Sequence, residues 1–149
     1  MTGPMTEFGN MAAKVADLDA AIDFYRGTGA EISGRGPWHG GERVDVFLGS
    51  VQLTLFTRAL YEDEIDLPEE CFLHMAVFTD DLDAAVADRD VRYGPTVVEG
   101  GFGRRRIAFV DAPGGYRLEL MQQLDDALEG AGSDLDSDSA DPNQSRLPW

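Results

Sequence analysis

Short runs of alternating apolar and polar residues dominate the first 123 positions, and two stretches between these runs have helical spacing. Apolar strands are predicted at 11–15 and 72–78, and each leads to an aspartate, Asp17 or Asp81, that can cap a helix. After each aspartate the apolar residues recur as on one face of a helix. Three more strands are expected in each half, at 30–35, 43–48 and 51–57, and at 96–99, 104–110 and 116–122.

The two halves repeat one sequence pattern. Residues 8–21 (FGNMAAKVADLDAA) and 72–85 (FLHMAVFTDDLDAA) are identical at eight of fourteen positions at a constant offset of 64. Such an internal repeat indicates two copies of one structural unit. Each copy has the pattern βαβββ, so we expect an α+β domain at 1–123 built from modules at 5–66 and 67–123.

The last residues have a different composition. The segment 124–149 is rich in Ser, Asp, Gly and Pro and carries seven acidic residues and one arginine. It shows little periodicity and few apolar residues that could be buried. We therefore expect an acidic, disordered tail.

Charge and cysteine content exclude several function classes. The chain of 149 residues has 28 acidic and 12 basic residues, so it offers no basic face for nucleic acid or for an anionic membrane. No apolar run approaches the roughly 20 residues of a membrane span. The single cysteine, Cys71, excludes a disulfide framework and a multi-cysteine metal site. The expected partner is a small molecule, and the expected compartment is the cytoplasm.

Two βαβββ modules with DLDAAIDFY after the first strand and FVDAPGGYRLELMQ at the end resemble the vicinal oxygen chelate superfamily. That superfamily includes glyoxalases, bleomycin-resistance proteins and extradiol dioxygenases, and the resemblance covers residues 5–123. It implies that each module curls its sheet into half of an open, cupped barrel. It also implies a homodimer, in which the half-barrels close either within one chain or between two swapped chains.

The resemblance places metal ligands at Asn10, Gln52, His74 and Glu119. The repeat supports these positions, because Asn10 and His74 correspond at an offset of 64, and Gln52 and Glu119 at an offset of 67. Strand alternation also puts Gln52 and Glu119 on the concave face. The implied cofactor is a divalent ion, with Mn, Co, Ni, Zn and Fe not distinguished, and a metal-free site remains an alternative.

Each ligand position also has a structural explanation. His74 can be a hydrogen-bonded core histidine, Glu119 can pair with an arginine such as Arg117, and Gln52 can bond a neighbouring strand residue. Asn10 departs from the superfamily, which usually has histidine or glutamine at that position. This departure counts most against a two-histidine, one-carboxylate iron site.

Lys14 and Asp45 are further candidates. Lys14 shares a strand face with Asn10 and is either an anion contact for substrate or a lysine that extends its ammonium to the rim. Asp45 interrupts an apolar strand and is either a second catalytic acid or base beside Glu119, or the ion-pair partner of an arginine such as Arg43.

The remaining substrate-binding candidates are Arg106, Phe56 and Trp38. Arg106, in the run 104–106, can receive an anionic substrate at the cavity mouth or form surface salt bridges. Phe56 shares the concave face with Gln52, and Trp38 belongs to a loop expected to cover the cavity.

The resemblance implies three functions that the sequence leaves open. The first, which we favour, is a metal-dependent isomerase, epimerase or lyase that acts beside a carbonyl through a metal-stabilised enolate, with Glu119 as ligand or base. The second is a metal-free drug-binding protein of the bleomycin-resistance type, which the acidic charge fits. The third is a ring-cleaving dioxygenase, which Asn10 disfavours.

Overall fold

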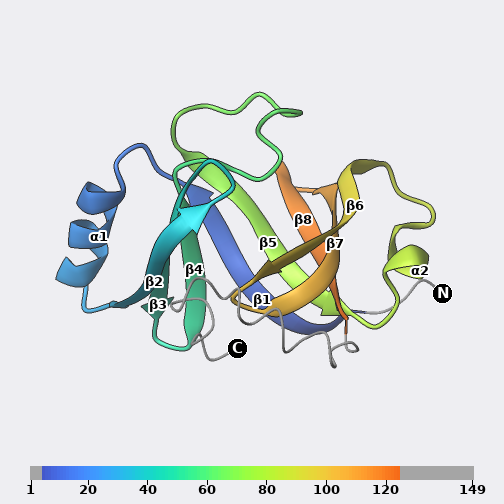
Figure 1. Ribbon diagram of the computed structural model, residues 1–149, viewed down its shortest axis with the longest axis horizontal. Helices are drawn as coiled ribbons and strands as arrows, with labels where there is room; N and C mark the ends of the chain where they lie inside the picture. The colour runs from blue at the N-terminus through green and yellow to red at the C-terminus, as the bar shows by residue number, and fades with distance from the viewer. Residues whose placement is uncertain (1–4, 125–149) are drawn as a thin grey trace.

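The computed structural model describes residues 5–124 (Figure 1). The predicted acidic tail therefore lies outside the described residues, except for Leu124. Ten elements follow one another along the chain, and they repeat the order βαβββ twice. They are β1 (Met5–Lys14), α1 (Leu18–Gly27), β2 (Glu31–Trp38), β3 (Gly41–Leu48), β4 (Val51–Phe56), β5 (Cys71–Thr79), α2 (Leu82–Val86), β6 (Val91–Gly100), β7 (Gly103–Ala112) and β8 (Tyr116–Gln123).

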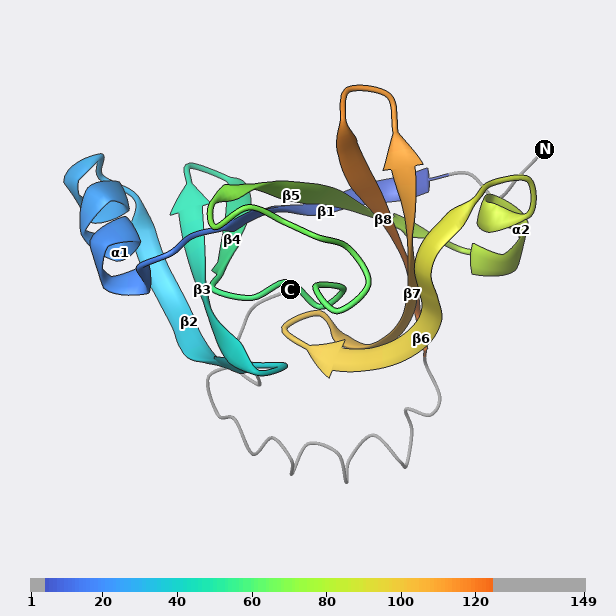
Figure 2. The ribbon, with the colours of Figure 1, turned by 90° about the horizontal axis from the view of Figure 1, so that it is seen from above.

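All eight strands form one sheet, in the order β2-β3-β4-β1-β5-β8-β7-β6. At its centre β1 pairs antiparallel with β5, while β1 pairs parallel with β4 and β5 parallel with β8. The two halves of the sheet curl toward each other, so that the sheet is cupped (Figure 2). The predicted α+β, glyoxalase-like fold is confirmed, with β2 and β6 as the unpaired edges of the sheet that residues 5–124 form.

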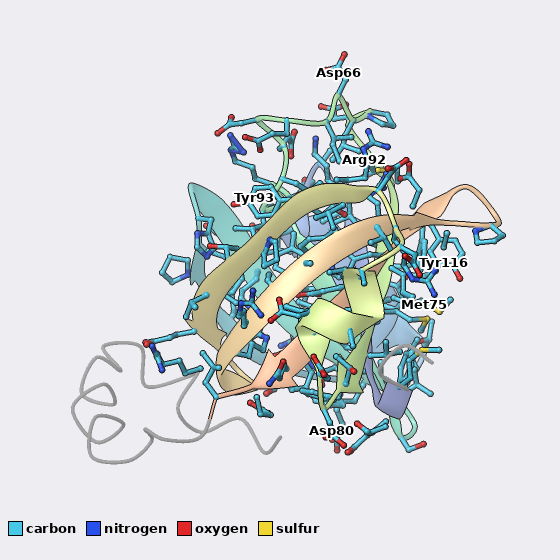
Figure 3. The ribbon with its side chains drawn as sticks, turned by 90° about the vertical axis from the view of Figure 1, so that its right-hand side faces the viewer. Asp66, Met75, Asp80, Arg92, Tyr93 and Tyr116 are labelled. Carbon is cyan, nitrogen blue, oxygen red and sulfur yellow. The ribbon has the colours of Figure 1, made fainter. Side chains whose placement is uncertain are left out.

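The helices cover the convex side of the cup. Asp17 and Asp81 cap them as predicted, each accepting a hydrogen bond from a backbone N–H three residues on. α1 buries Leu18 and Ile22 against β3 and β4, and the short α2 buries Leu82 against β7 and β8 (Figure 3). Within residues 5–124, no helix is both long and apolar enough to cross a membrane.

The concave side is filled by side chains from the sheet and from the loop at 57–70. This loop joins β4 to β5 and crosses one end of the cup (Figures 1 and 2). It inserts Tyr61, which is fully buried and packs edge-on against Phe109 with ring centroids 4.7 Å apart. The loop thereby closes the cup at one end and leaves a small cavity beneath it.

The sheet requires a glycine at position 94. Gly94 has a φ of +89°, and a Cβ there would lie 2.6 Å from the Ile107 carbonyl oxygen of the neighbouring strand. Gly29 has a similar φ of +92° but has nothing within 4 Å of a Cβ. An L residue at either position would have a strained backbone, and at position 94 its Cβ would also clash with the neighbouring strand.

We expect Gly29→Ala to lower the free energy of unfolding by about 1–2 kcal/mol, which is the cost of a left-handed backbone. Gly94→Ala is expected to cost about 1–3 kcal/mol more, because its Cβ also displaces β7. Urea unfolding of the two variants and the parent measures both costs. Equal losses would mean that the close approach of β6 and β7 does not constrain the sheet.

Candidate functional site

The four predicted ligand positions line one cavity between the two modules. Asn10 comes from β1, Gln52 from β4, His74 from β5 and Glu119 from β8, and each is at most 8% exposed. These are the four central strands of the sheet, so each module supplies two of the side chains. The cavity has a volume of about 40 Å³. A single water needs about 10–15 Å³, so this conformation has room for an ion with waters or for one small group of a substrate rather than for a whole substrate.

A fully buried carboxylate, Asp45, organises the first module's half of the site. Its Oδ2 accepts from Arg43 Nη2 at 2.7 Å, and its Oδ1 accepts from Thr54 Oγ1 at 2.8 Å and from Gln52 Nε2 at 3.0 Å. Burial raises the pKa of the Asp45 carboxyl, and the charge of Arg43 and these hydrogen bonds oppose the rise. All three contacts donate to Asp45, as an ionised carboxylate requires.

These donations fix the orientation of both carboxamides. Thr54 gives its hydroxyl hydrogen to Asp45, so its oxygen accepts from Asn10 Nδ2 at 2.8 Å. Asn10 and Gln52 therefore both turn their NH₂ ends toward this network. Their carbonyl oxygens accept no hydrogen bond from the described residues, and these oxygens are the ends that can ligate a metal ion.

His74 is held between two partners. Its Nε2 lies 3.2 Å from Glu119 Oε1, and its Nδ1 lies 2.9 Å from the Tyr61 hydroxyl. Burial raises the pKa of Tyr61 to about 12, so the phenol keeps its hydrogen at neutral pH. A phenol can donate or accept, so Tyr61 can satisfy Nδ1 in either imidazole tautomer. Such a contact would hold Nε2 toward the cavity.

The sequence does not reveal Tyr61, because the acidic loop at 57–70 has neither strand nor helix periodicity. The only signal there is an aromatic residue among acidic ones. The sequence also does not reveal that Thr54 and Asp45 bond to the two carboxamides. These contacts depend on the pairing of β3 with β4, which places Asp45 opposite Thr54.

The other predicted residues have mixed placements. Phe56 and Trp38 line the cavity. Lys14 is buried but pairs with Glu62 of the loop at 2.6 Å and is absent from the lining. Asp45 lies behind the lining, locked in its network, so the geometry gives it a positioning role in place of the expected acid or base role.

Arg106 forms a surface salt bridge, the second of its two expected roles. Arg106 points to the convex side, where its Nη2 lies 2.9 Å from Asp83 of α2. Its neighbour Arg105 faces the other way and lines the cavity. Successive strand residues point to opposite faces of a sheet, so only one of two adjacent arginines can line the cavity.

Comparison with known proteins places this geometry in a family. The model of the Glyoxalase/Bleomycin resistance protein/Dioxygenase superfamily matches residues 8–120, which is most of the chain. No curated protein matches the chain in sequence.

Solved structures share the fold. A methylmalonyl-CoA epimerase from Mycobacterium tuberculosis superposes with a TM-score of 0.61 at 22% identity, covering 86% of this chain and 95% of that one. A glyoxalase/bleomycin resistance protein/dioxygenase superfamily member from Vibrio splendidus 12B01 gives 0.56 at 14% identity, covering 80% and 100%. A 2,2',3-trihydroxybiphenyl 1,2-dioxygenase from Sphingomonas wittichii strain RW1 gives 0.53 at 18% identity, covering 83% and 45%.

The burial of Tyr61 predicts a pH dependence of stability. The unfolded Tyr61 loses its proton near pH 10, whereas the folded Tyr61 keeps it to about pH 12. The folded state thus binds more protons in this window, so stability falls as the pH rises from 10 to 12, by up to about 3 kcal/mol. Tyr61→Phe should flatten this fall in pH-dependent urea unfolding, and Tyr25→Phe, which removes a half-buried phenol outside the cavity, is the control. A slope in Tyr61→Phe that equals that of the parent would contradict the assignment.

Proposed function

The chain belongs to the glyoxalase/bleomycin resistance protein/dioxygenase superfamily, and we propose that it is a metal-dependent enzyme that moves a proton beside a carbonyl group, as an isomerase, epimerase or lyase. One observation carries the proposal. An imidazole, a carboxylate and two carboxamides, from all four central strands, line a single buried cavity.

The donor set fits a divalent ion. His74 offers a nitrogen, Glu119 a carboxylate, and Asn10 and Gln52 amide oxygens, which suit Mn, Fe, Co, Ni or Zn. Among residues 5–124, no three His, Cys, Asp or Glu side chains come together. A complete ligand set therefore depends on the two carboxamides. Their orientation matters because it decides whether their carbonyl oxygens are available as ligands.

The residues of the chain divide the work. A divalent ion bound there would polarise a carbonyl oxygen and stabilise the negative charge that develops on it. Glu119 is the only carboxylate among the described lining residues, so it is the group that can take and return the proton when it is not bound to the ion. Trp38, Phe56 and Phe109 belong to the apolar part of the lining, which helps to exclude water and strengthens electrostatic interactions inside.

The two other functions have less support. Binding of cationic drugs fits the acidic chain, but it gives no role to His74 and Glu119, which lie together in the cavity at two of the ligand positions. A ring-cleaving dioxygenase of the two-histidine type needs a second imidazole. His39 is in the turn after β2, where it packs edge-on against Trp38 with ring centroids 4.5 Å apart, and His74 is the sole lining histidine.

Metal content tests the proposal directly. We expect about one divalent ion per chain in protein purified without a metal-affinity step, and its loss in His74→Ala and Glu119→Gln. Elemental mass spectrometry measures the content, and His39→Ala is the matched control, expected to keep the ion. A parent that takes up none of Mn, Co, Ni or Zn would refute the metal-dependent enzyme and favour the binding protein.

The orientation of the carboxamides predicts a second result. Thr54→Val removes the hydroxyl that holds the Asn10 amide while keeping the shape of the side chain. We expect Mn²⁺ affinity to fall by about 10–100-fold, as for other supports of metal ligands. Thr54→Ser, which keeps the hydroxyl, should stay near the parent in calorimetric titration. Unchanged affinity in Thr54→Val would show that Asn10 is not a ligand.

A further inference from the structure

Arg105 is a buried cation without an acidic partner. It is 6% exposed, its Nη1 donates to the Gly103 carbonyl at 3.1 Å, and its buried Nε has no hydrogen-bond partner. No carboxylate among residues 5–124 lies within 4 Å of its guanidinium. Burying a charge without a partner is costly, so such a group is typical of a site that a ligand completes.

The internal repeat identifies what Arg105 lacks. In the first module Arg43 lies opposite Phe56, and Asp45 opposite Thr54. In the second module Arg105 and Ile107 occupy the corresponding places, opposite Gln123 and Met121. Arg43 is equally buried, but Asp45 neutralises it at 2.7 Å. Arg105 has the same position with an isoleucine in place of that aspartate.

The surroundings of Arg105 favour one kind of ligand. Its guanidinium lies over the Phe102 ring at 5.4 Å, so its edge remains the surface for hydrogen bonds. Glu119 lines the same cavity and its charge favours the charged form of Arg105, but it lies more than 4 Å away and forms no ion pair with it, and it would repel a dianion. A planar monoanion therefore matches the single uncompensated charge and the fork of donors.

We propose that Arg105 binds a carboxylate group of the molecule that the cavity takes, so that the substrate is a carboxylic acid anion. The inference rests on the proposed function in one respect, because it takes this anion to be part of the substrate on which Glu119 acts. The carboxylate takes the place in the second module that the Asp45 side chain occupies in the first. Arg105 is thus a binding residue that sets specificity, and Phe102 holds its guanidinium in place.

The probe is the monomethyl ester of malonate, which is a monoanion at neutral pH and is called malonate below. Malonamide is its neutral counterpart, and inorganic phosphate is the other anion. Titration of the full-length protein, as purified and after chelator treatment, follows the Arg105 Nε–H signal by NMR. We expect malonate to shift this signal in a saturable way in both samples, and malonamide to leave it unchanged. Absence of a shift with malonate, or tighter binding of phosphate, would overturn the carboxylate assignment.

Variants separate a binding role from a structural one. Arg105→Met should weaken malonate binding by about 10-fold or more, as expected for loss of a charged hydrogen bond. It should also raise the Tm of the ligand-free protein, because it removes a buried unpaired charge, whereas a structural arginine would lower the Tm when replaced. Arg106→Gln removes the same charge one residue along, on the outer face, and should change neither malonate binding nor metal content. Malonate binding that survives in Arg105→Met would refute the proposal.

Metal content distinguishes this inference from the proposed function. If the parent binds metal but not malonate, the carboxylate site is wrong and the metal-dependent enzyme stands. If the parent binds malonate through Arg105 but no metal, the carboxylate site stands and the enzyme proposal is wrong. Arg105→Lys covers the case in which Arg105→Met fails to fold, because it keeps the charge and should lose part of the malonate affinity.

Discussion

One buried carboxylate determines the polarity of the site. Asp45 is fully enclosed, and a charge in that position is stable only while every contact donates to it. Arg43 neutralises the charge, and Thr54 and Gln52 supply the remaining hydrogen bonds. The Thr54 hydroxyl has only one hydrogen, and it donates this hydrogen to Asp45. Its oxygen can then only accept, so Asn10 must turn its NH₂ group toward Thr54. An aspartate that never lines the cavity thereby decides which atoms of two other residues do.

The same backbone carries different chemistry in its two halves. The first module places two carboxamides in a dense polar network around Asp45. The second places His74 beside Glu119 and near apolar side chains such as Ile107 and Met121. Where the first module has Asp45 the second has Ile107, so Arg43 has an ion-pair partner and Arg105 has none within residues 5–124. The repeat therefore gives two half-sites with the same backbone and different side-chain chemistry.

Much of the fold could be predicted, because the repeat, the caps and the strand alternation are local signals. The resemblance to the superfamily predicted Asn10, Gln52, His74 and Glu119 as ligand positions, and the repeat and the strand alternation agreed with that prediction. Arg105 and Arg106 show the limit: β7 is apolar on both faces, so alternation gives no contrast that tells inner from outer positions. Tyr61 shows another limit. Its position in the core depends on how the loop packs against the sheet, and a loop has no periodic pattern from which that packing could be predicted.

The charge of the chain is a poor guide to the cavity. The net charge is −16, yet the charged residues that line the cavity are Arg43, Arg105 and Glu119 beside His74. Surface carboxylates are screened within about 10 Å at ordinary salt, whereas interactions inside a buried, apolar cavity are screened much less. A ligand therefore responds to the few enclosed charges rather than to the acidic exterior. With Arg43 already paired with Asp45, the unpaired Arg105 determines the sign of the ligand's charge.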